Sequence, residues 1–258
     1  AGVDVILVGD SVGTNVLGYA SAKDVTLQDM LHHLKAVKRG VHRAYLLVDL
    51  PYGSYDNTSD ALRHARTLQQ AGADGIKLEG YRPEIIAHLT GHGVEVCAHL
   101  GLTPQIHEKM TLQAKNTEAA LQLLKESQSL QEAGAFMLLF ELIPEEVAQQ
   151  ATRHLSIPTI GIGAGRYTDG QVLVVNDMLG VNAFEFRHNL KNETFHARGI
   201  RAIKAYVSDV QQGLFPQAAH VRHLDKAEAN RFTHAVERSF KELPALSKDG
   251  RVKQTQGN

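Results

Sequence analysis

AGADGIKLEG, residues 71–80, contains one complete junction between a helix and a strand. Gly72 directly follows a segment with helical periodicity, where a left-handed glycine commonly ends a helix. The apolar stretch 75–79 then reads as a short strand, and it closes on a carboxylate, Glu79. The same small-glycine-small step precedes the strands that begin near residues 3 and 136. The repeated unit is helix, cap and strand, which predicts an alternating α/β fold.

Apolar runs predict seven strands, at 3–10, 44–49, 75–79, 94–99, 136–141, 159–163 and, with the weakest pattern, 172–175. Such continuous runs are typical of parallel strands that are buried on both faces. Helical spacing of apolar residues predicts helices between them, at Ser59–Gln70 and Glu118–Gln131. Thr58 or Ser59 is the expected N-cap of the first of these helices.

This alternation predicts a (β/α)8 TIM barrel, a fold of about 250 residues, and the chain has 258. Because a barrel of this kind closes with eight strands, we expect the first βα unit to be missing from this chain. An open doubly wound sheet is the alternative, and it needs no missing unit. We expect residues 1–212 to form the barrel domain, and 213–258 to form a C-terminal helical extension with a helix over 226–243 and a polar tail.

Composition narrows the class of protein. Lys and Arg number 27 against 28 Asp and Glu, so the net charge of -1 provides no field that would attract nucleic acid or anionic lipid. The chain lacks an apolar run of eighteen residues, and it has a single cysteine, Cys97, which excludes intramolecular disulfides and thiolate-rich zinc sites. We expect a cytoplasmic protein that binds neither nucleic acid nor membrane, with Cys97 as a core residue.

Carboxylates end the first three strands, at Asp10, Asp49 and Glu79. In a barrel the carboxyl ends of the strands meet at one mouth, so these side chains are expected to converge. Hard oxygen ligands suit Mg²⁺, which makes the three acids candidate metal ligands. The alternative for each acid is that it caps the helix that follows its strand.

Lys77 lies two residues before Glu79 and therefore points to the same face of its strand. A buried lysine needs anionic partners, so Lys77 either meets a substrate carboxylate or forms a structural ion pair with Glu79 or a neighbouring acid. Ser11 follows Asp10 where the strand turns. Its hydroxyl and backbone N–H are placed to hold a carboxylate, or to cap the next segment.

Glu141 ends the intensely apolar run FMLLFE, residues 136–141. A carboxylate in such dry surroundings suits a general acid or base near neutral pH, so Glu141 is the first choice for proton transfer. The alternative is that Glu141 caps the helix expected near Pro144. His99 closes the preceding strand, where it could orient the substrate or shuttle a proton, although with 14 histidines in the chain a core role is the alternative.

Six ordered blocks of sequence resemble the ketopantoate hydroxymethyltransferase family: VGDS (8–11), DLPYGSY (49–55), KLEG (77–80), AHLGLTPQ (98–105), FELIP (140–144) and IPTIGIGAGRYTDGQVLVVNDMLG (157–180). The resemblance implies a (β/α)8 barrel related to phosphoenolpyruvate mutase and isocitrate lyase, dependence on Mg²⁺, and a homo-oligomer, typically a decamer. It also implies site roles: metal binding by Asp10, Asp49 and Glu79; contacts to a 2-oxoacid by Asp10, Ser11, Asp49 and Lys77; and proton transfer by Glu141.

The reaction implied by the resemblance is a hydroxymethyl transfer from 5,10-methylenetetrahydrofolate to 3-methyl-2-oxobutanoate. It would proceed through a Mg²⁺-stabilised enolate and give 2-dehydropantoate, a step of pantothenate biosynthesis. Two alternatives remain: a Mg²⁺-dependent 2-oxoacid lyase or mutase of the same superfamily, and a non-catalytic oligomeric relative. The features that point to the second are the missing first βα unit and two stretches that depart from the family pattern, 106–115 and 184–188.

Overall fold

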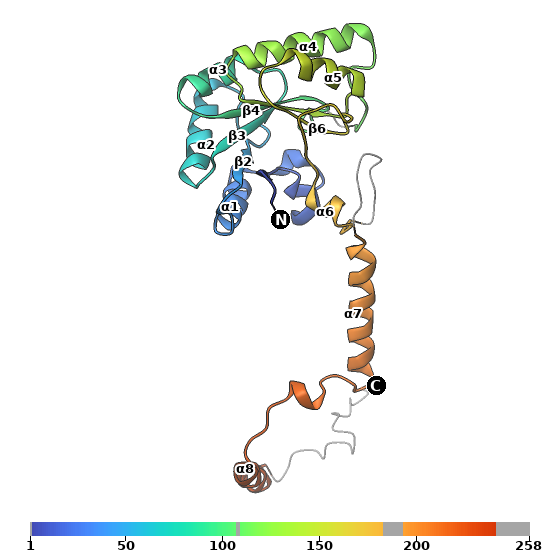
Figure 1. Cartoon of the computed structure of the whole chain (residues 1–258). Coiled ribbons are helices and arrows are strands. Elements are labelled where there is room, and N and C mark those ends of the chain that lie inside the picture. The colour runs from blue at the N-terminus through green and yellow to red at the C-terminus, as the bar shows by residue number, and fades with distance from the viewer. Residues whose placement is uncertain (1, 107–108, 183–192, 241–258) are drawn as a thin grey trace, which may run out of the picture. The chain divides into compact units, whose positions relative to one another are not determined.

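The computed structural model describes residues 2–106, 109–182 and 193–240. They fall into two compact units, divided after Ala197. The first unit contains one parallel sheet of seven strands, coloured blue to yellow in Figure 1. The strands are β1 (Val5–Val8), β2 (Tyr45–Asp49), β3 (Gly75–Glu79), β4 (Val96–Gly101), β5 (Met137–Glu141), β6 (Thr159–Ile162) and β7 (Gly170–Gln171).

Strand order decides between the two predicted architectures. The strands are paired in their order along the chain, from β1 to β7, and every pair is parallel. A doubly wound sheet would reverse its order at a switch point, so that alternative is wrong. The sequential order of a (β/α) barrel is confirmed. A further βα unit ahead of β1 stays a prediction.

Helices connect the strands and cover the outer face of the sheet (Figure 1). They are α1 (Leu27–Lys38), α2 (Thr58–Gln70), α3 (Pro83–Gly91), α4 (Thr117–Glu132) and α5 (Glu145–His154). Two short helices, η1 (Gly13–Leu17) and η2 (Ala22–Asp24), lie between β1 and α1, and α6 (Val175–Met178) follows β7. Left-handed glycines follow α2 and α4 as predicted, at Gly72 (φ 109°) and Gly134 (φ 98°). The predicted N-cap of α2 is wrong, because Asn57 caps this helix by accepting a hydrogen bond from the Asp60 N–H.

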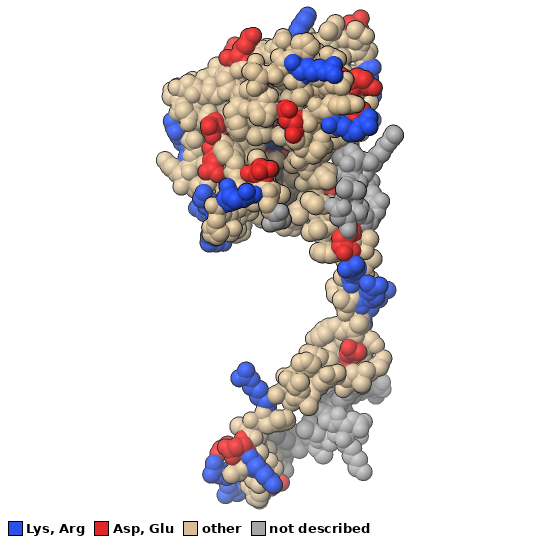
Figure 2. All heavy atoms as spheres, viewed as in Figure 1, with Lys and Arg blue, Asp and Glu red and all other residues tan. Residues whose placement is uncertain are grey.

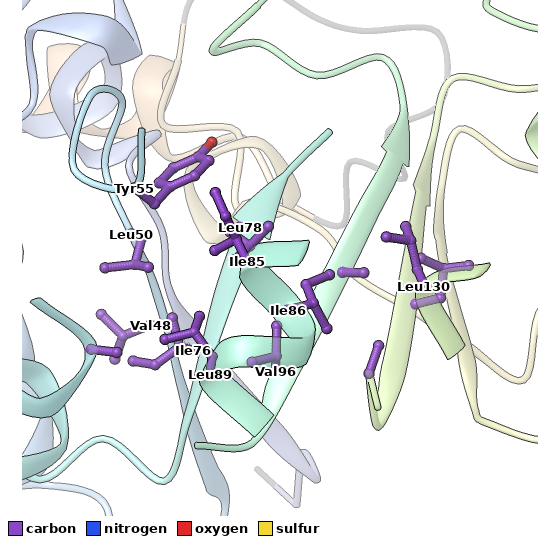
Figure 3. Close-up of a cluster of buried hydrophobic side chains, with 14 of the residues drawn as sticks. Val48, Leu50, Tyr55, Ile76, Leu78, Ile85, Ile86, Leu89, Val96 and Leu130 are labelled. Atoms are coloured by element: carbon purple, nitrogen blue, oxygen red, sulfur yellow. The ribbon is translucent and has the colours of Figure 1, made fainter. Parts of the chain in front are cut away.

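Two apolar layers hold the first unit together. The larger layer lies between sheet and helices, where Ile76 and Leu78 of β3 meet Ile86 and Leu89 of α3 (Figure 3). The smaller layer lies on the other face of the strands and has Leu47, Cys97, Met137 and Leu139 at its centre. Cys97 is thus a core residue, as expected. Because side chains alternate along a strand, β1, β2, β4 and β5 contribute to both layers.

The prediction of a strand at 172–175 is wrong. The last strand, β7, is Gly170–Gln171, and Val174 is already the N-cap of α6. The Asp169 carboxylate accepts hydrogen bonds from the backbone N–H and the hydroxyl of Thr159, which aligns 170–171 beside β6. The valine-rich run had the composition of a strand, but pairing to β6 ends with the Val172 N–H on the Gly161 carbonyl.

The second unit begins within α7 (Phe195–Gln211) and continues through η3 (Ala218–His220) to α8 (Lys226–Ser239). The helix expected over 226–243 is present up to Ser239, and 241–243 lie outside the described residues. The predicted domain division at 212 stays a prediction. Within the described part of the chain, no helix combines the length and the apolar character needed to cross a membrane. Figure 2 shows acidic and basic side chains interspersed over the visible face of the first unit.

Candidate active site

Alternation along the strands places charged residues at the carboxyl end of the inner layer. Two residues beyond Leu47 lies Asp49, beyond Cys97 lies His99, and beyond Leu139 lies Glu141. The side chains of Asp49 and His99 are almost fully buried, whereas that of Glu141 is 13 % exposed. The apolar inner layer therefore gives way to a polar cluster at its carboxyl end, which is where barrel enzymes keep their reactive groups.

Strand register sets which charges meet. Asp49 of β2 is level with Lys77 of β3, and the Lys77 Nζ lies 2.6 Å from Asp49 Oδ1. Glu79 lies farther from the ammonium, with Oε1 at 4.0 Å. Burial alone would lower the pKa of Lys77, but the carboxylates of Asp49, Glu79 and Asp10 together raise it. Lys77 is therefore a permanent buried cation at the mouth, as the sequence predicted, and its main partner is Asp49.

Asp10 joins this cluster from the turn after β1. Its backbone N–H donates a 3.0 Å hydrogen bond to Asp49 Oδ2, which brings the two aspartates side by side. Burial, followed by the negative charge of Asp49, raises the pKa of Asp10 to about 7. The carboxyl of Asp10 is thus crowded by like charge and takes a proton readily unless a cation relieves it.

His99 lies between two glutamates. Its Nδ1 is 3.4 Å from Glu79 Oε1 and its Nε2 is 3.4 Å from Glu141 Oε2, contacts that are electrostatic because neither has hydrogen-bond geometry. Burial would lower the pKa of His99, but Glu79 and Glu141 raise it to about 9. An imidazolium at neutral pH therefore links Glu79 to Glu141, and a catalytic role for His99 stays a prediction.

Ser11 and Glu141 border the cluster and are only partly buried. The Ser11 hydroxyl lies on the side of Gly9 that also faces Asp49, because a Cβ built at Gly9 would sit 3.4 Å from Ser11 Oγ and 3.3 Å from Asp49 Oδ2. All the site residues predicted from the sequence thus come from the carboxyl ends of β1 to β5.

Capping does not explain these side chains. The N-caps of the elements that follow β1, β2 and β3 are Val12, Asn57 and Arg82, so Asp10, Asp49 and Glu79 cap nothing there. Pro144 is the N-cap of α5, in place of Glu141, and Ser11 forms no capping bond to η1. The capping alternatives considered for the predicted site residues are therefore wrong.

Two residues of the cluster were not predicted. Gln105 is 0 % exposed, and its side chain donates a 2.6 Å hydrogen bond to Asp10 Oδ2. The Tyr55 hydroxyl donates to Gln105 Oε1. A fully buried glutamine at the end of AHLGLTPQ, and a tyrosine in DLPYGSY, are the sequence signals that could have found them, because buried polar side chains need partners.

The donor set fits a hard cation. Four carboxylates, at Asp10, Asp49, Glu79 and Glu141, face two positive groups, so negative charge is in excess in a buried place. Within 2–106, 109–182 and 193–240, however, no group of three His, Cys, Asp or Glu side chains is spaced to hold a metal ion. Both oxygens of Asp49 and Oε2 of Glu79 already accept hydrogen bonds from N–H donors, so a cation held by these carboxylates would have to displace some of those donors.

Comparison with known proteins identifies the family. The model of the ketopantoate hydroxymethyltransferase family matches residues 1–218. This chain belongs to that family. A relative from Pseudothermotoga lettingae, named 3-methyl-2-oxobutanoate hydroxymethyltransferase, is 45 % identical over 224 residues, which are 84 % of each chain. The resemblance seen in the sequence is therefore confirmed.

Solved structures of more distant proteins share the fold of this hydroxymethyltransferase family member. A phosphonopyruvate hydrolase matches with a TM-score of 0.55 and 13 % identity, over 93 % of this chain and 88 % of that one. A 2,3-dimethylmalate lyase, described as a PEP mutase/isocitrate lyase superfamily member, matches with a TM-score of 0.51 and 14 % identity over 97 % and 87 %. At these identities the likeness concerns the barrel and not the chemistry.

Proposed function

We propose that this protein transfers a hydroxymethyl group from 5,10-methylenetetrahydrofolate to 3-methyl-2-oxobutanoate, giving 2-dehydropantoate and tetrahydrofolate. C3 of the oxoacid loses a proton and bonds to the one-carbon unit, and water supplies the hydroxyl oxygen. The names of its relatives support this activity. The observation that carries the proposal is the buried ammonium of Lys77 beside Asp49, with Glu141 partly exposed on the same rim.

Lys77 and Ser11 are proposed to hold the carboxylate of the oxoacid. Lys77 is only 4 % exposed, so its ammonium interacts more strongly with an anion than it would in water, because the surroundings screen it less. The Ser11 hydroxyl lies on the same side of the turn as Asp49. This arrangement would orient C3 of the substrate toward the remaining open carboxylate, that of Glu141.

Glu141 is proposed to remove the C3 proton. Its carboxylate is the partly exposed one of the cluster, and the imidazolium of His99 lies 3.4 Å from Oε2. His99 is itself fixed by Glu79 on its other side, so the histidine would orient Glu141. General-base catalysis by a positioned carboxylate contributes roughly 10²- to 10⁴-fold to a rate.

A Mg²⁺ ion is proposed to bind through Asp10 and Asp49, with Glu79 as a further ligand of the predicted set. When bound, the ion would supply positive charge for the carboxylate and keto oxygens of the oxoacid. The excess of buried carboxylates supports this proposal. Mg²⁺ commonly takes one or two protein carboxylates and fills its remaining positions with water and substrate oxygens.

Deuterium exchange at C3 of 3-methyl-2-oxobutanoate tests the proposal. We expect NMR to show exchange that requires the protein and Mg²⁺, and formation of 2-dehydropantoate only when 5,10-methylenetetrahydrofolate is added. Exchange that is followed by cleavage or rearrangement without the folate would favour the lyase or mutase alternative. Absence of both exchange and product would favour a non-catalytic relative.

A homo-oligomer is proposed as the working form, with a decamer as the expectation from the family resemblance. Helix α7 carries exposed apolar side chains at helical spacing, at Ile203, Tyr206, Val207 and Val210. Such a stripe is typical of a helix that packs against another surface, and a second copy of the chain is the proposed occupant. Sedimentation velocity of the full chain tests this, because a monomer at micromolar concentration would contradict it.

A further inference from the structure

Gln105 connects two of the candidate metal ligands. Its side-chain Nε2 donates to Asp10 Oδ2 at 2.6 Å, and its backbone N–H donates to Glu79 Oε2 at 2.9 Å. One residue, which comes from the loop after β4, therefore holds the carboxylate of Asp10, in the turn after β1, and that of Glu79, at the end of β3, at the same time. Both bonds are charge-assisted, and such bonds are stronger than those between neutral groups.

The orientation of the Gln105 amide is fixed by its other partners. The second Nε2 proton is donated to the Leu50 carbonyl at 3.1 Å, and Oε1 accepts a hydrogen bond from the Tyr55 hydroxyl. A reversed amide would turn Oε1 toward the Leu50 carbonyl, which only accepts, and toward Asp10, which only accepts when it is ionised. The reversed amide is therefore excluded, and the amide presents its donor edge to Asp10.

Tyr55 supports this arrangement from the side of the apolar layer. Figure 3 shows the ring of Tyr55 above Leu50, with its hydroxyl directed away from the apolar cluster. The Glu79 backbone N–H also donates to this hydroxyl, at 3.3 Å. Tyr55 is 5 % exposed, so its hydroxyl has lost most of its contact with water and depends on Gln105 and Glu79 for partners.

A neutral amide suits this position. A carboxylate at residue 105 would add repulsion to a cluster in which like charge already crowds Asp10. A lysine would place a second ammonium close to Asp10 and would compete with a bound cation for its carboxylate. Glutamine supplies donors without altering the net charge, so the excess of negative charge remains for a cation to neutralise.

We propose that Gln105, oriented by Tyr55, is a positioning residue that holds Asp10 and Glu79 for a divalent cation. The role rests on the proposed Mg²⁺ site. Partners that hold metal ligands in place typically contribute 10- to 100-fold to metal affinity. We expect Gln105→Met, which keeps the volume and removes the side-chain donors, to weaken binding about tenfold or more.

The test measures Mn²⁺ binding by calorimetry and by the loss of the free-ion EPR signal, with no substrate present. Tyr55→Phe removes only the hydroxyl and is expected to weaken binding about threefold, which is less than the effect of a direct partner because Tyr55 acts only through Gln105. Ser127→Ala is the matched control, because Ser127 is equally buried and its hydroxyl bonds the Leu123 carbonyl within α4. The Mn²⁺ affinity of Ser127→Ala should stay within about twofold of the wild type, because a residue that does not contact the metal site should not change its affinity by more.

The outcomes separate this role from the proposed function. If the wild type binds Mn²⁺ and Gln105→Met binds it equally well, the role of Gln105 is overturned while the metal site stands. If the wild type does not bind Mn²⁺, the metal site itself is overturned, and the role of Gln105 with it. Should Gln105→Met fail to fold by circular dichroism, Tyr55→Phe decides, and wild-type affinity in that variant overturns the proposal.

Discussion

Lys77 and Asp49 form a buried ion pair across β2 and β3, with 2.6 Å between Nζ and Oδ1 and side-chain exposures of 5 % and 3 %. The residues are 28 positions apart in the chain and are brought level by the register of the two strands. This ion pair belongs both to the buried structure of the sheet and to the proposed active site. The Lys77 ammonium, which would bind the carboxylate of the substrate, also neutralises Asp49, a candidate metal ligand.

Replacing Lys77 with methionine should destabilise the protein. The change leaves the Asp49 carboxylate buried without its cation, and breaking a buried pair in this way costs about 3 to 5 kcal/mol. Urea denaturation measures the free energy of unfolding. Lys35→Met, on the exposed side of α1, is the control and should change it by less than about 0.5 kcal/mol. A cost below about 1 kcal/mol for Lys77→Met would show that the pair is not the stabilising contact inferred from its burial.

Asp10→Asn should stabilise the metal-free protein at pH 8. Because the folded state raises the pKa of Asp10 from 3.8 to about 7, its contribution to stability is present below about pH 4 and is lost as pH rises to 7. Removing the charge should therefore raise the free energy of unfolding at pH 8 by on the order of 4 kcal/mol. The gain should shrink as pH is lowered toward 4. A gain that does not depend on pH would contradict this origin.

Glu141→Gln should abolish proton transfer while leaving the fold intact. We expect deuterium exchange at C3 of the oxoacid to fall by at least about 100-fold, because the amide cannot accept the proton. Substrate affinity should change little, since Lys77 and Ser11 are the proposed carboxylate contacts. Glu145→Gln is the control, because that carboxylate pairs with Arg166 at the surface. Exchange within tenfold of the wild type in Glu141→Gln would assign the proton transfer to another group.

Gly101→Ala should disturb the rim at the end of β4. Gly101 has φ 93°, and a Cβ there would lie 2.2 Å from the Glu141 carbonyl oxygen. The added methyl group therefore introduces both backbone strain and steric overlap. We expect the free energy of unfolding, measured by thermal denaturation, to fall by about 3 kcal/mol. Gly91→Ala is the control, since a Cβ at Gly91 would meet nothing within 4 Å. Equal stability of the two variants would contradict the close approach of β4 and β5.

At two places the tertiary structure differs from the prediction made from local sequence. The run at 172–175 had the apolar composition of a strand, yet Val174 caps a helix, because the Asp169 carboxylate bonds Thr159 and fixes the pairing two residues earlier. At the start of α2, Thr58 had the right chemistry for an N-cap, but Asn57 takes that place. Helix ends are decided within one residue by backbone geometry, which composition does not specify.

The sequence by itself determined the barrel and most of the residues at its mouth. Hydrophobic periodicity and cap glycines are local signals in the sequence. Residues two positions apart on a strand point to the same face, so Asp49 lies on the same face of β2 as the inner apolar residue Leu47. The tertiary structure alone decided the partners. Gln105 bonds Asp10 across 95 positions of sequence, and His99 joins Glu79 to Glu141, because strand register and loop closure place side chains that no local pattern connects.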